Sequence, residues 1–539
     1  MPNPLIPRFG ATVCLVLSLN CVITLAHAAT IPCEGLRGLT APNVSITLAT
    51  TVPAGSFLPP DTAAPVTMPA FCRVAGVASP MADSTIKFEV WMPLSWNGKL
   101  DSGGNGGYGR GFALPVDFMV PALHRGYAVA GTDMGHPLTV GYDASWAYGK
   151  PTKIIDWAYQ ANHVTAGVAK TIIKAFYGDG PHLSYFTGCS DGGHEALMEA
   201  QRFPDDYDGI IGGALANNWS LQSAAHVWQA RALINSALPT SKFPLIHNAA
   251  LAACDALDGI RDGIIENPLR CNFDPGVLQC DGADGPNCLT AAQVDAVRKM
   301  YSGPVNPRTG APIYPGEEPG SELGWSFTLP PTPGGIGPQF YKYFVYQNPS
   351  WDMNTLDFDY DVTYGQAVGG PIVDSTNPDL RAFEERGGKF IMYHGWADQA
   401  INPRNSANYF ESVARSIAPA NRSDQAPLSP SQIKQTQQFL RLFFIPGMPH
   451  CLGGPGVDTF DALSALENWV ERGIAPDEII GSHTGASIGP NIMTAPPPGS
   501  SFTRPLCPYP QVAHYNGHGS TSDASNFSCG NSQSDDAGN

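Results

Sequence analysis

The sequence predicts an α/β fold, and two patterns support this prediction. Short β-prone runs alternate with helix-forming runs up to about residue 216 and again from about residue 375, which is typical of a mostly parallel sheet covered by helices on both faces. Between residues 217 and 374 this alternation gives way to long loops rich in proline and glycine. We therefore expect one core formed by residues 29–216 and 375–539, with residues 217–374 inserted as a lid domain.

A third pattern narrows the fold class. Tyr185–Thr187 is a β-prone run, Gly188–Gly192 (Gly-Cys-Ser-Asp-Gly) is a tight turn, and Glu195–Ala200 favours a helix. Strand, Gly-x-Ser-x-Gly and helix together form the nucleophile elbow of an α/β-hydrolase, in which Ser190 would be the nucleophile. Its glycines permit the strained turn that exposes the serine. Gly485–Gly489 also matches the pentapeptide, but a proline and no helical run follow it, so the context favours Ser190 over a chance match.

Composition excludes some classes of function. With 539 residues, of which 43% are hydrophobic, the chain can bury a large core and can hold more than one domain. Its formal charge of −17 argues against a nucleic-acid partner, because no basic patch is available to neutralise phosphates.

The first 28 residues have the features of a signal peptide. Arg8 is the only charged side chain, an apolar stretch runs from Ala11 to Leu25, and Ala26-His27-Ala28 has the small-x-small pattern of a cleavage site. The apolar stretch is too short and too interrupted for a good membrane anchor. We expect the mature protein to be soluble and exported, either secreted or periplasmic.

The cysteines predict a disulfide framework. Twelve are present, and Cys14 and Cys21 would leave with the signal peptide. The remaining even number in an exported chain implies up to five disulfides. Zinc ligation is the alternative, and the lack of any Cys-x-x-Cys pair speaks against it. Sequence neighbours suggest the pairs Cys33–Cys72, Cys254–Cys271, Cys280–Cys288 and Cys507–Cys529, which leaves Cys189 with Cys451.

Other elements of the core follow in order along the chain. Residues 29–95 look β-rich, with alternating runs at 45–50 and 86–91. Asn162–Phe176 carries apolar residues at helical spacing. The remaining expected elements are strands at Tyr127–Asp133, Asp208–Gly212, Lys389–His394 and Phe439–Ile445, and a helix at Asp461–Val470.

The glycine-rich loop Lys99–Gly109 follows a short strand. Phosphate binding is one interpretation, but the loop has neither Gly-Lys-Ser/Thr nor the spacing of a dinucleotide-binding loop. An oxyanion-hole loop fits better, because hydrolases of this fold take one backbone N–H from such a loop and one from the residue after the nucleophile. We therefore expect the N–H groups of Asp191, Gly104 and Gly106 to bind the oxyanion; a plain flexible turn is the alternative.

The insertion is rich in aromatic residues. They can form the core of the insertion itself, or one or two of them can line a pocket for a planar substrate. The residues in question are Trp325, Phe327, Phe340, Tyr341, Tyr343, Phe344, Tyr346 and Trp351.

An acidic loop also lies in the insertion. Asp255, Asp258 and Asp262 occur with two glycines within Cys254–Ile264. A hard cation such as calcium takes several oxygen ligands, and bends at glycine can turn backbone carbonyls inward beside the acids. The spacing is not that of an EF-hand, and a solvated acidic turn is the alternative.

Chain order identifies the partners of the serine. In this fold the nucleophile, the acid and the histidine follow one another along the chain, each on a loop after a strand. Ser190, Asp398 and His450 satisfy both conditions. His450 would take the proton of the serine, and Asp398 would orient the imidazole.

Thirteen histidines are present, so His450 needs a further argument. Cys189 precedes the serine and Cys451 follows this histidine, and a bond between the two cysteines would tie the two loops together. His394, which lies beside the acid loop, is expected to be structural.

Three motifs resemble those of the tannase and feruloyl esterase family, which also contains mono(2-hydroxyethyl) terephthalate hydrolase: Gly188–Gly193, His394–Asp398 and Gly447–Cys451. The resemblance covers nearly the whole mature chain. It implies an α/β-hydrolase core, a lid that shapes the acyl pocket and a structural calcium. The chain departs from the family pattern at His194, where arginine is frequent, and at Pro449, where glycine is usual. The implied calcium ligands are Asp255, Asp258, Asp262 and the backbone carbonyls of Ile260 and Ile264.

The resemblance and the motifs together predict a serine carboxylic ester hydrolase that cleaves feruloyl (hydroxycinnamoyl) or galloyl esters through an acyl-enzyme. Its substrate would be a small aromatic ester, free or attached to plant cell-wall polysaccharide, and it would have no nucleic-acid or membrane partner. Hydrolysis of terephthalate-type monoesters or diesters is the alternative, for which Lys342 and Arg381 are the nearest basic residues to clamp a carboxylate. A calcium-stabilised binding protein with a vestigial triad is a third hypothesis, which the intact elbow, triad and glycine loop oppose.

Overall fold

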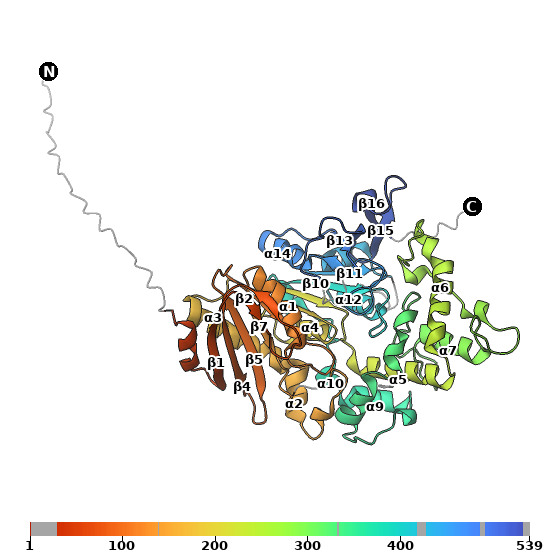
Figure 1. Ribbon diagram of the computed structural model, residues 1–539, viewed down its shortest axis with the longest axis horizontal. Coiled ribbons are helices and arrows are strands. Elements are labelled where there is room, and N and C mark those ends of the chain that lie inside the picture. The colour runs from red at the N-terminus through yellow and green to blue at the C-terminus, as the bar shows by residue number, and fades with distance from the viewer. Residues whose placement is uncertain (2–29, 138–139, 331–333, 418–426, 486–490, 532–539) are drawn as a thin grey trace.

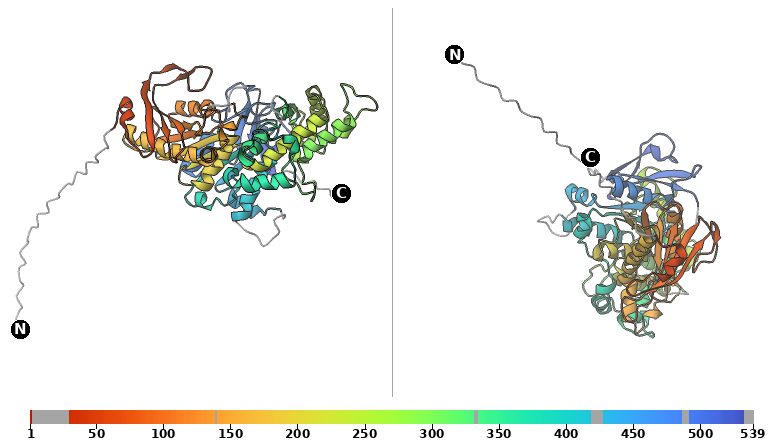
Figure 2. Two further views of the ribbon diagram at one scale, coloured as in Figure 1. Left: turned by 90° about the horizontal axis from the view of Figure 1, so that it is seen from below. Right: turned by 90° about the vertical axis from the view of Figure 1, so that its left-hand side faces the viewer.

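The computed structural model describes Met1 and residues 30–137, 140–330, 334–417, 427–485 and 491–531. The expected signal peptide beyond Met1 and Ser487 of the second Gly-x-Ser-x-Gly match lie outside the described residues. Antiparallel strands from the first part of the chain lie at one end of the molecule, and the helices α6 (Phe243–Cys254) and α7 (Ala291–Ser302) lie at the other (Figures 1 and 2).

The central sheet has the strand order β1-β4-β5-β7-β6-β8-β9-β10-β11. The first four strands in this order pair antiparallel, whereas every neighbouring pair from β7 to β11 is parallel. The predicted mostly parallel sheet is therefore confirmed, and the β-rich N-terminal region forms its antiparallel end. The strands are β1 (Val44–Val52), β4 (Phe71–Ala78), β5 (Ile86–Pro93), β6 (Lys99–Gly103), β7 (Ala128–Thr132), β8 (Leu183–Cys189), β9 (Gly209–Gly213), β10 (Lys389–Gly395) and β11 (Leu440–Ile445).

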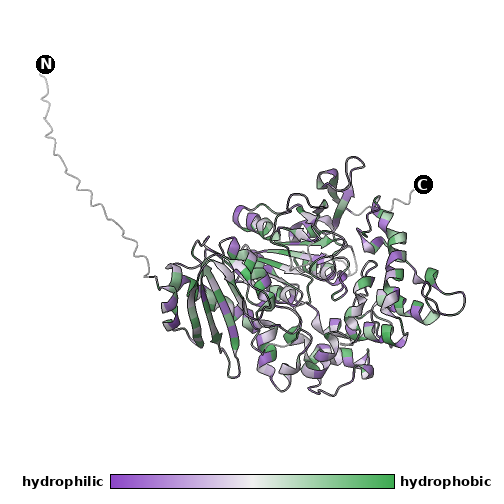
Figure 3. Cartoon of the chain, viewed as in Figure 1, coloured by the Kyte–Doolittle hydropathy of each residue, from purple (hydrophilic) through white to green (hydrophobic). Residues whose placement is uncertain are grey.

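Both faces of the sheet are covered, and for this reason its strands are continuous apolar runs. In β10, Phe390 and Met392 belong to a core that includes residues of α4 and α12, while Ile391 and Tyr393 belong to another with residues of α1 and α14. Hydrophobic residues accordingly follow the central strands in Figure 3. The helices outside the insertion are α1 (Ala113–His124), α2 (Pro151–Ile155), α3 (Ala161–Tyr177), α4 (Asp191–Arg202), α11 (Arg381–Glu385), α12 (Arg404–Ile417), α13 (Pro430–Thr436) and α14 (Ala462–Arg472).

Residues 217–374 contribute helices and, as far as they are described, no strand to the sheet. The chain leaves the sheet after β9 and returns in β10, and these two strands pair with each other. The segment is thus inserted between neighbouring strands without interrupting the sheet. Its helices are α5 (Trp219–Asn235), α6 (Phe243–Cys254), α7 (Ala291–Ser302), α8 (Gly337–Phe340), α9 (Tyr360–Val368) and α10 (Gly370–Val373).

Most aromatic residues of the insertion serve packing. Trp325 contacts Phe243 and Tyr301 inside the insertion. Phe344 contacts Tyr108 and Trp157 of the first core segment, so the insertion is packed onto the sheet-bearing part by aromatic rings. Among the helices of the described ranges, none has the length and apolar character needed to cross a membrane.

Smaller sheets and disulfides complete the fold. All five predicted disulfides are present: Cys33–Cys72, Cys189–Cys451, Cys254–Cys271, Cys280–Cys288 and Cys507–Cys529. The smaller sheets are formed by β2 (Gly55–Phe57) with β3 (Val66–Met68), by β12 (Thr459–Phe460), β13 (Ile479–His483) and β14 (Phe502–Leu506), and by β15 (Gln511–Tyr515) with β16 (Phe527–Asn531).

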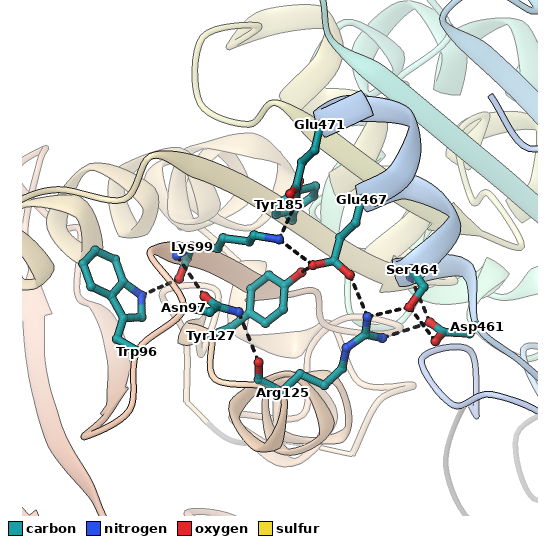
Figure 4. Close-up of polar contacts among 10 residues, drawn as sticks. All are labelled: Trp96, Asn97, Lys99, Arg125, Tyr127, Tyr185, Asp461, Ser464, Glu467 and Glu471. Atoms are coloured by element: carbon teal, nitrogen blue, oxygen red, sulfur yellow. Dashed lines mark hydrogen bonds and ion pairs between the residues drawn. The ribbon is translucent and has the colours of Figure 1, made fainter. Parts of the chain in front are cut away.

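A polar network fixes α14 across the starts of the parallel strands (Figure 4). Glu467 of α14 accepts hydrogen bonds from Tyr127 and from the charged groups of Lys99 and Arg125, the last two at 2.7 Å. Tyr185 of β8 donates to Glu471, one helical turn further on, at 3.0 Å. The polar partners are partly buried, so the loss of one would leave the others unpaired. The network therefore holds α14 firmly against the sheet, at the edge where the parallel strands begin.

Candidate active site

Loops that follow four parallel strands meet at one edge of the sheet. Parallel strands all end at the same edge, so side chains on the loops after them can converge although they lie far apart in sequence. β6 leads into the glycine-rich loop, β8 into Ser190, β10 into Asp398 and β11 into His450.

Ser190 stands in a strained turn between β8 and α4. Its φ of 69° and ψ of −118° lie in a region that side-chain-bearing residues rarely adopt, at a cost on the order of 1–3 kcal/mol. A Cβ on Gly188 would lie 2.6 Å from the carbonyl oxygen of Gly192, and a Cβ on Gly193 would lie 2.3 Å from that of Gly213. α4 therefore lies too close to β8 at Gly188, and to the end of β9 at Gly193, for any residue except glycine at these two positions.

The three predicted triad residues are brought together. The Nε2 atom of His450 lies 2.8 Å from Oγ of Ser190, and its Nδ1 atom lies 2.8 Å from Oδ2 of Asp398. With Nδ1–H donating to the carboxylate, Nε2 is left as the acceptor for the serine hydroxyl. This arrangement can remove the proton of Ser190 when its oxygen attacks a carbonyl carbon.

Asp398 is fully buried and bound from several sides. Its Oδ1 atom accepts the N–H groups of Ala400 at 2.8 Å and Ile401 at 3.0 Å, and Oδ2 lies 3.1 Å from Nε2 of His394. Burial alone would raise the pKa of Asp398, but the charge of His450 and hydrogen bonds from both histidines lower this pKa below its usual range. The carboxylate therefore stays ionised at neutral pH and can orient His450.

His394 holds the acid loop from within the protein. It is completely buried, with Nδ1 at 2.7 Å from Oγ of Ser406 and Nε2 at 3.0 Å from the carbonyl oxygen of Ile401. Its contact with Asp398 agrees with the structural role expected from the sequence, and no contact to Ser190 is present among the described residues. Sequence reasoning missed that contact, which the spacing of four between the two residues could have suggested.

The bridge Cys189–Cys451 links the residue before Ser190 to the residue after His450, with Cα atoms 6.1 Å apart. It spans 262 residues of chain. The elbow and the histidine loop are thereby joined covalently next to the 2.8 Å contact between serine and histidine.

The hydrogen bonds of the glycine loop contradict part of the predicted oxyanion hole. The N–H of Gly104 donates to the carbonyl of Thr187 at 2.9 Å, and that of Gly106 donates to Oδ1 of Asn105 at 2.9 Å. Both groups are engaged inside the protein, so the predicted use of Gly104 and Gly106 for an oxyanion is wrong. The N–H of Asp191, at the start of α4, has no acceptor among the described residues, nor has that of Gly107.

A cavity of about 800 Å³ opens above Ser190 and His450. Most of its wall is apolar, and it is shared between the core and the insertion. Phe327 is the one of the eight aromatics singled out in the sequence that lines the cavity among the described residues. Other apolar wall residues are Leu114, Phe118, Trp219, Leu329 and Ile336.

Comparison with known proteins identifies the family. The family model described as tannase and feruloyl esterase matches residues 72–530. The chain belongs to the tannase and feruloyl esterase family. The resemblance that the motifs suggested is thus confirmed, and the chain is a carboxylic ester hydrolase.

Relatives in this family match nearly the whole chain. It is 40% identical to an uncharacterised esterase of Xanthomonas campestris, over 95% of this chain and 93% of that protein. It is 32% identical to the mono(2-hydroxyethyl) terephthalate hydrolase of Piscinibacter sakaiensis, over 92% of this chain and 91% of the relative. The crystal structure of feruloyl esterase B from Aspergillus oryzae superposes with a TM-score of 0.79 at 31% identity, covering 92% of this chain and 99% of that one. The predicted α/β-hydrolase fold is confirmed.

Two charged residues of this esterase line the cavity and were not found from the sequence. Arg110 is exposed, and its guanidinium makes no hydrogen bond or ion pair with any described residue. Asp117 is exposed at its surface, but desolvation of its carboxyl in the cavity wall raises its pKa to about 6, although the charge of Arg110 opposes this shift. Of the two basic residues considered earlier, Arg381 pairs with Asp379, and neither Lys342 nor Arg381 is among the described residues of the cavity wall.

The acidic loop lies apart from the triad and against the C-terminal segment. Oδ1 of Asp255 accepts the N–H of Asp262 at 3.1 Å, Oδ1 of Asp258 accepts that of Ile260 at 2.9 Å, and Arg504 pairs with Asp262 at 2.9 Å. Three carboxylates beside free backbone carbonyls are oxygen donors of the kind that calcium takes, so the donor chemistry fits. In the described ranges, however, no three acidic, histidine or cysteine side chains are gathered as a ready metal site.

Proposed function

We propose that this protein is a secreted serine esterase that hydrolyses hydroxycinnamoyl or galloyl esters through an acyl-enzyme. One observation carries the proposal: the hydrogen-bonded chain Ser190–His450–Asp398 opens into an apolar cavity of about 800 Å³. The probable feruloyl esterase B-1 of Aspergillus oryzae, 33% identical over 85% of this chain, supports the choice of acid.

The reaction would run in two halves. Oγ of Ser190 attacks the ester carbonyl carbon while Nε2 of His450 takes the hydroxyl proton, and the imidazolium is stabilised by Asp398. The negative oxygen of the tetrahedral intermediate would accept the N–H groups of Asp191 and Gly107, which have no acceptor among the described residues. When the intermediate collapses, the alcohol leaves with the proton from His450. Water, deprotonated by His450, then attacks the acyl carbon and releases the aromatic acid and free Ser190.

The cavity wall favours an aromatic acyl group. Apolar pockets with few polar groups bind ligands by burying apolar surface, and aromatic rings prefer edge or offset contacts with other rings. Phe327 is available for such a contact in the wall of the cavity that holds Ser190. We further propose that residues 217–374 form the lid that closes this wall.

A second candidate function has one observation in its favour. Arg110 presents an unpaired guanidinium in the wall of the cavity, and guanidinium groups bind carboxylates in a bidentate way. Such a group could bind the free carboxylate of a terephthalate monoester, the substrate named in the relative from Piscinibacter sakaiensis.

Substrate panels test both functions directly. Hydrolysis of methyl ferulate, methyl gallate and mono(2-hydroxyethyl) terephthalate should be compared at equal enzyme concentration. We expect kcat/KM to be highest for one of the two methyl esters. A higher kcat/KM for the terephthalate monoester, lost in Arg110→Gln, would favour the second function. Failure to release p-nitrophenol from aromatic p-nitrophenyl esters would contradict both functions.

We also propose that the acidic loop binds a structural calcium through Asp255, Asp258, Asp262 and the carbonyls of Ile260 and Ile264. Binding to the native state alone stabilises it by about 2.7 kcal/mol at a hundredfold excess over Kd. Prolonged chelation should therefore lower Tm, and readdition of calcium should restore it. Asp258→Ala should abolish this response, whereas the exposed Asp281→Ala should keep it; a wild-type Tm that is unaffected by chelator would contradict the site.

Export is part of the proposal. Residues 1–28 would be removed as a signal peptide, and five disulfides suit an oxidising compartment.

A further inference from the structure

Three carboxyl groups are buried along one face of α4, directly behind the nucleophile. Asp191, Glu195 and Glu199 follow one another at intervals of one helical turn, and each is at most 1% exposed. Buried carboxyl groups are expensive to desolvate, so each needs a reason to be there. The Asp191 carboxyl lies 3.1 Å from Nδ1 of His194, and neither oxygen of Glu199 has a hydrogen-bond partner among the described residues. Glu195 differs from both.

Glu195 binds the backbone of the glycine loop. Its Oε2 atom accepts the N–H of Asn105 at 2.9 Å. The carbonyl of the same residue accepts the N–H of Gly192, in the first turn of α4, also at 2.9 Å. Both the N–H and the carbonyl group of Asn105 are therefore hydrogen-bonded to α4. Asn105 and Glu195 are 90 residues apart in sequence.

We call these two hydrogen bonds between Asn105 and α4 the clamp, and the packing around them is tight. A Cβ on Gly104 would lie 2.8 Å from Oε2 of Glu195 and 2.8 Å from Cα of Gly192. The side chain of Asn105 fixes the rest of the loop, because Oδ1 accepts the N–H groups of Gly106 at 2.9 Å and Arg110 at 3.1 Å. The position of the loop after residue 105 thus depends on where Asn105 is held.

We propose that Glu195 is a positioning residue for the oxyanion hole: by clamping Asn105 it sets the distance between the N–H of Asp191 on α4 and that of Gly107 on the loop. This inference rests on the proposed esterase function. Losing one oxyanion donor typically lowers kcat by about 10²–10³-fold, and a displacement of about 1 Å can lower the rate by about 10²-fold. The clamp acts on the transition state, where the oxygen becomes negative, and much less on the bound ester.

The clamp needs an acceptor and not a charge. Burial raises the pKa of Glu195, and the charge of the nearby Asp191 raises it further, so both disfavour the ionised form of this carboxyl. A glutamine side chain has the same length and keeps a carbonyl acceptor for Asn105. Methionine has a similar volume but has no strong acceptor, and would leave the buried N–H unpaired.

The test compares Glu195→Met with Glu195→Gln on an ester that the wild-type enzyme hydrolyses. We expect Met to lower kcat by about 10²-fold while KM changes less than about twofold, and Gln to restore most of kcat. Phenylboronic acid, which forms a tetrahedral adduct on the serine, should bind the Met variant more weakly by the same factor as the loss in kcat. The aromatic product acid should bind both variants equally.

Glu199→Met is the matched control, because it removes a buried carboxyl from the same helix face without removing a hydrogen bond to the glycine loop. It should keep wild-type kcat. Gly104→Ala disturbs the same contact from the loop, because the added Cβ would press on Glu195 and Gly192. It should lower kcat in the same way, and it provides the test if Glu195→Met folds poorly.

Three outcomes would overturn the inference: wild-type kcat in Glu195→Met, an equal loss in Glu199→Met, or unchanged boronate binding. None of these outcomes bears on the proposed function, which is tested separately by the substrate panel and by Ser190→Ala.

Discussion

Ser190→Ala is expected to abolish ester hydrolysis while the protein stays folded. Deleting the nucleophile of a triad typically lowers kcat by about 10⁶-fold. The turn at this position is set by Gly188 and Gly193, which the close packing of α4 against β8 and β9 requires, and not by the hydroxyl. Alanine meets the same backbone strain as serine at φ 69°, so Tm should change little. Steady-state hydrolysis of methyl ferulate and a thermal melt measure the two quantities.

The second Gly-x-Ser-x-Gly match supplies the control. Ser487→Ala should keep full activity, because no helix-forming run follows this serine in the sequence. Activity above a tenth of wild type in Ser190→Ala, or its loss in Ser487→Ala, would show that the elbow has been misassigned.

Replacing both Cys189 and Cys451 with alanine should have the second largest effect. The bond closes a loop of 262 residues, for which the chain-entropy model gives a stabilisation of roughly 5 kcal/mol. The contact of 2.8 Å between Ser190 and His450 would also loosen, and about 1 Å of drift can lower the rate by about 10²-fold. We expect activity to be lost at temperatures where circular dichroism still reports native structure.

A second disulfide of the chain allows a matched comparison. Cys280–Cys288 spans only 8 residues within the insertion, and on the same model it contributes roughly half as much. Its double alanine variant should lower Tm moderately and leave kcat unchanged. An equal loss of kcat in both double variants would show that the Cys189–Cys451 bridge has no specific role in holding Ser190 and His450 together.

The sequence by itself determined the fold class, the elbow and the order of the triad. These features depend on local patterns: a buried two-sided strand is a continuous apolar run, and a strand–helix turn around Ser190 needs glycine on both sides. The disulfide pairing followed because each remaining partner lay close along the chain, which left Cys189 for Cys451. Convergence of Ser190, Asp398 and His450 followed from parallel strands that end at one edge.

Only the tertiary structure decided which groups are free to act. Gly104 and Gly106 looked as suitable as Gly107 in the sequence, but their N–H groups donate to Thr187 and to Asn105. Whether a backbone N–H is available depends on what lies against it, and that is set by segments far away in the chain. The same holds for Glu195, whose partner Asn105 is 90 residues distant: residue type and spacing along the chain fix how strands and helices form, but they leave open which donor meets which acceptor when those elements pack.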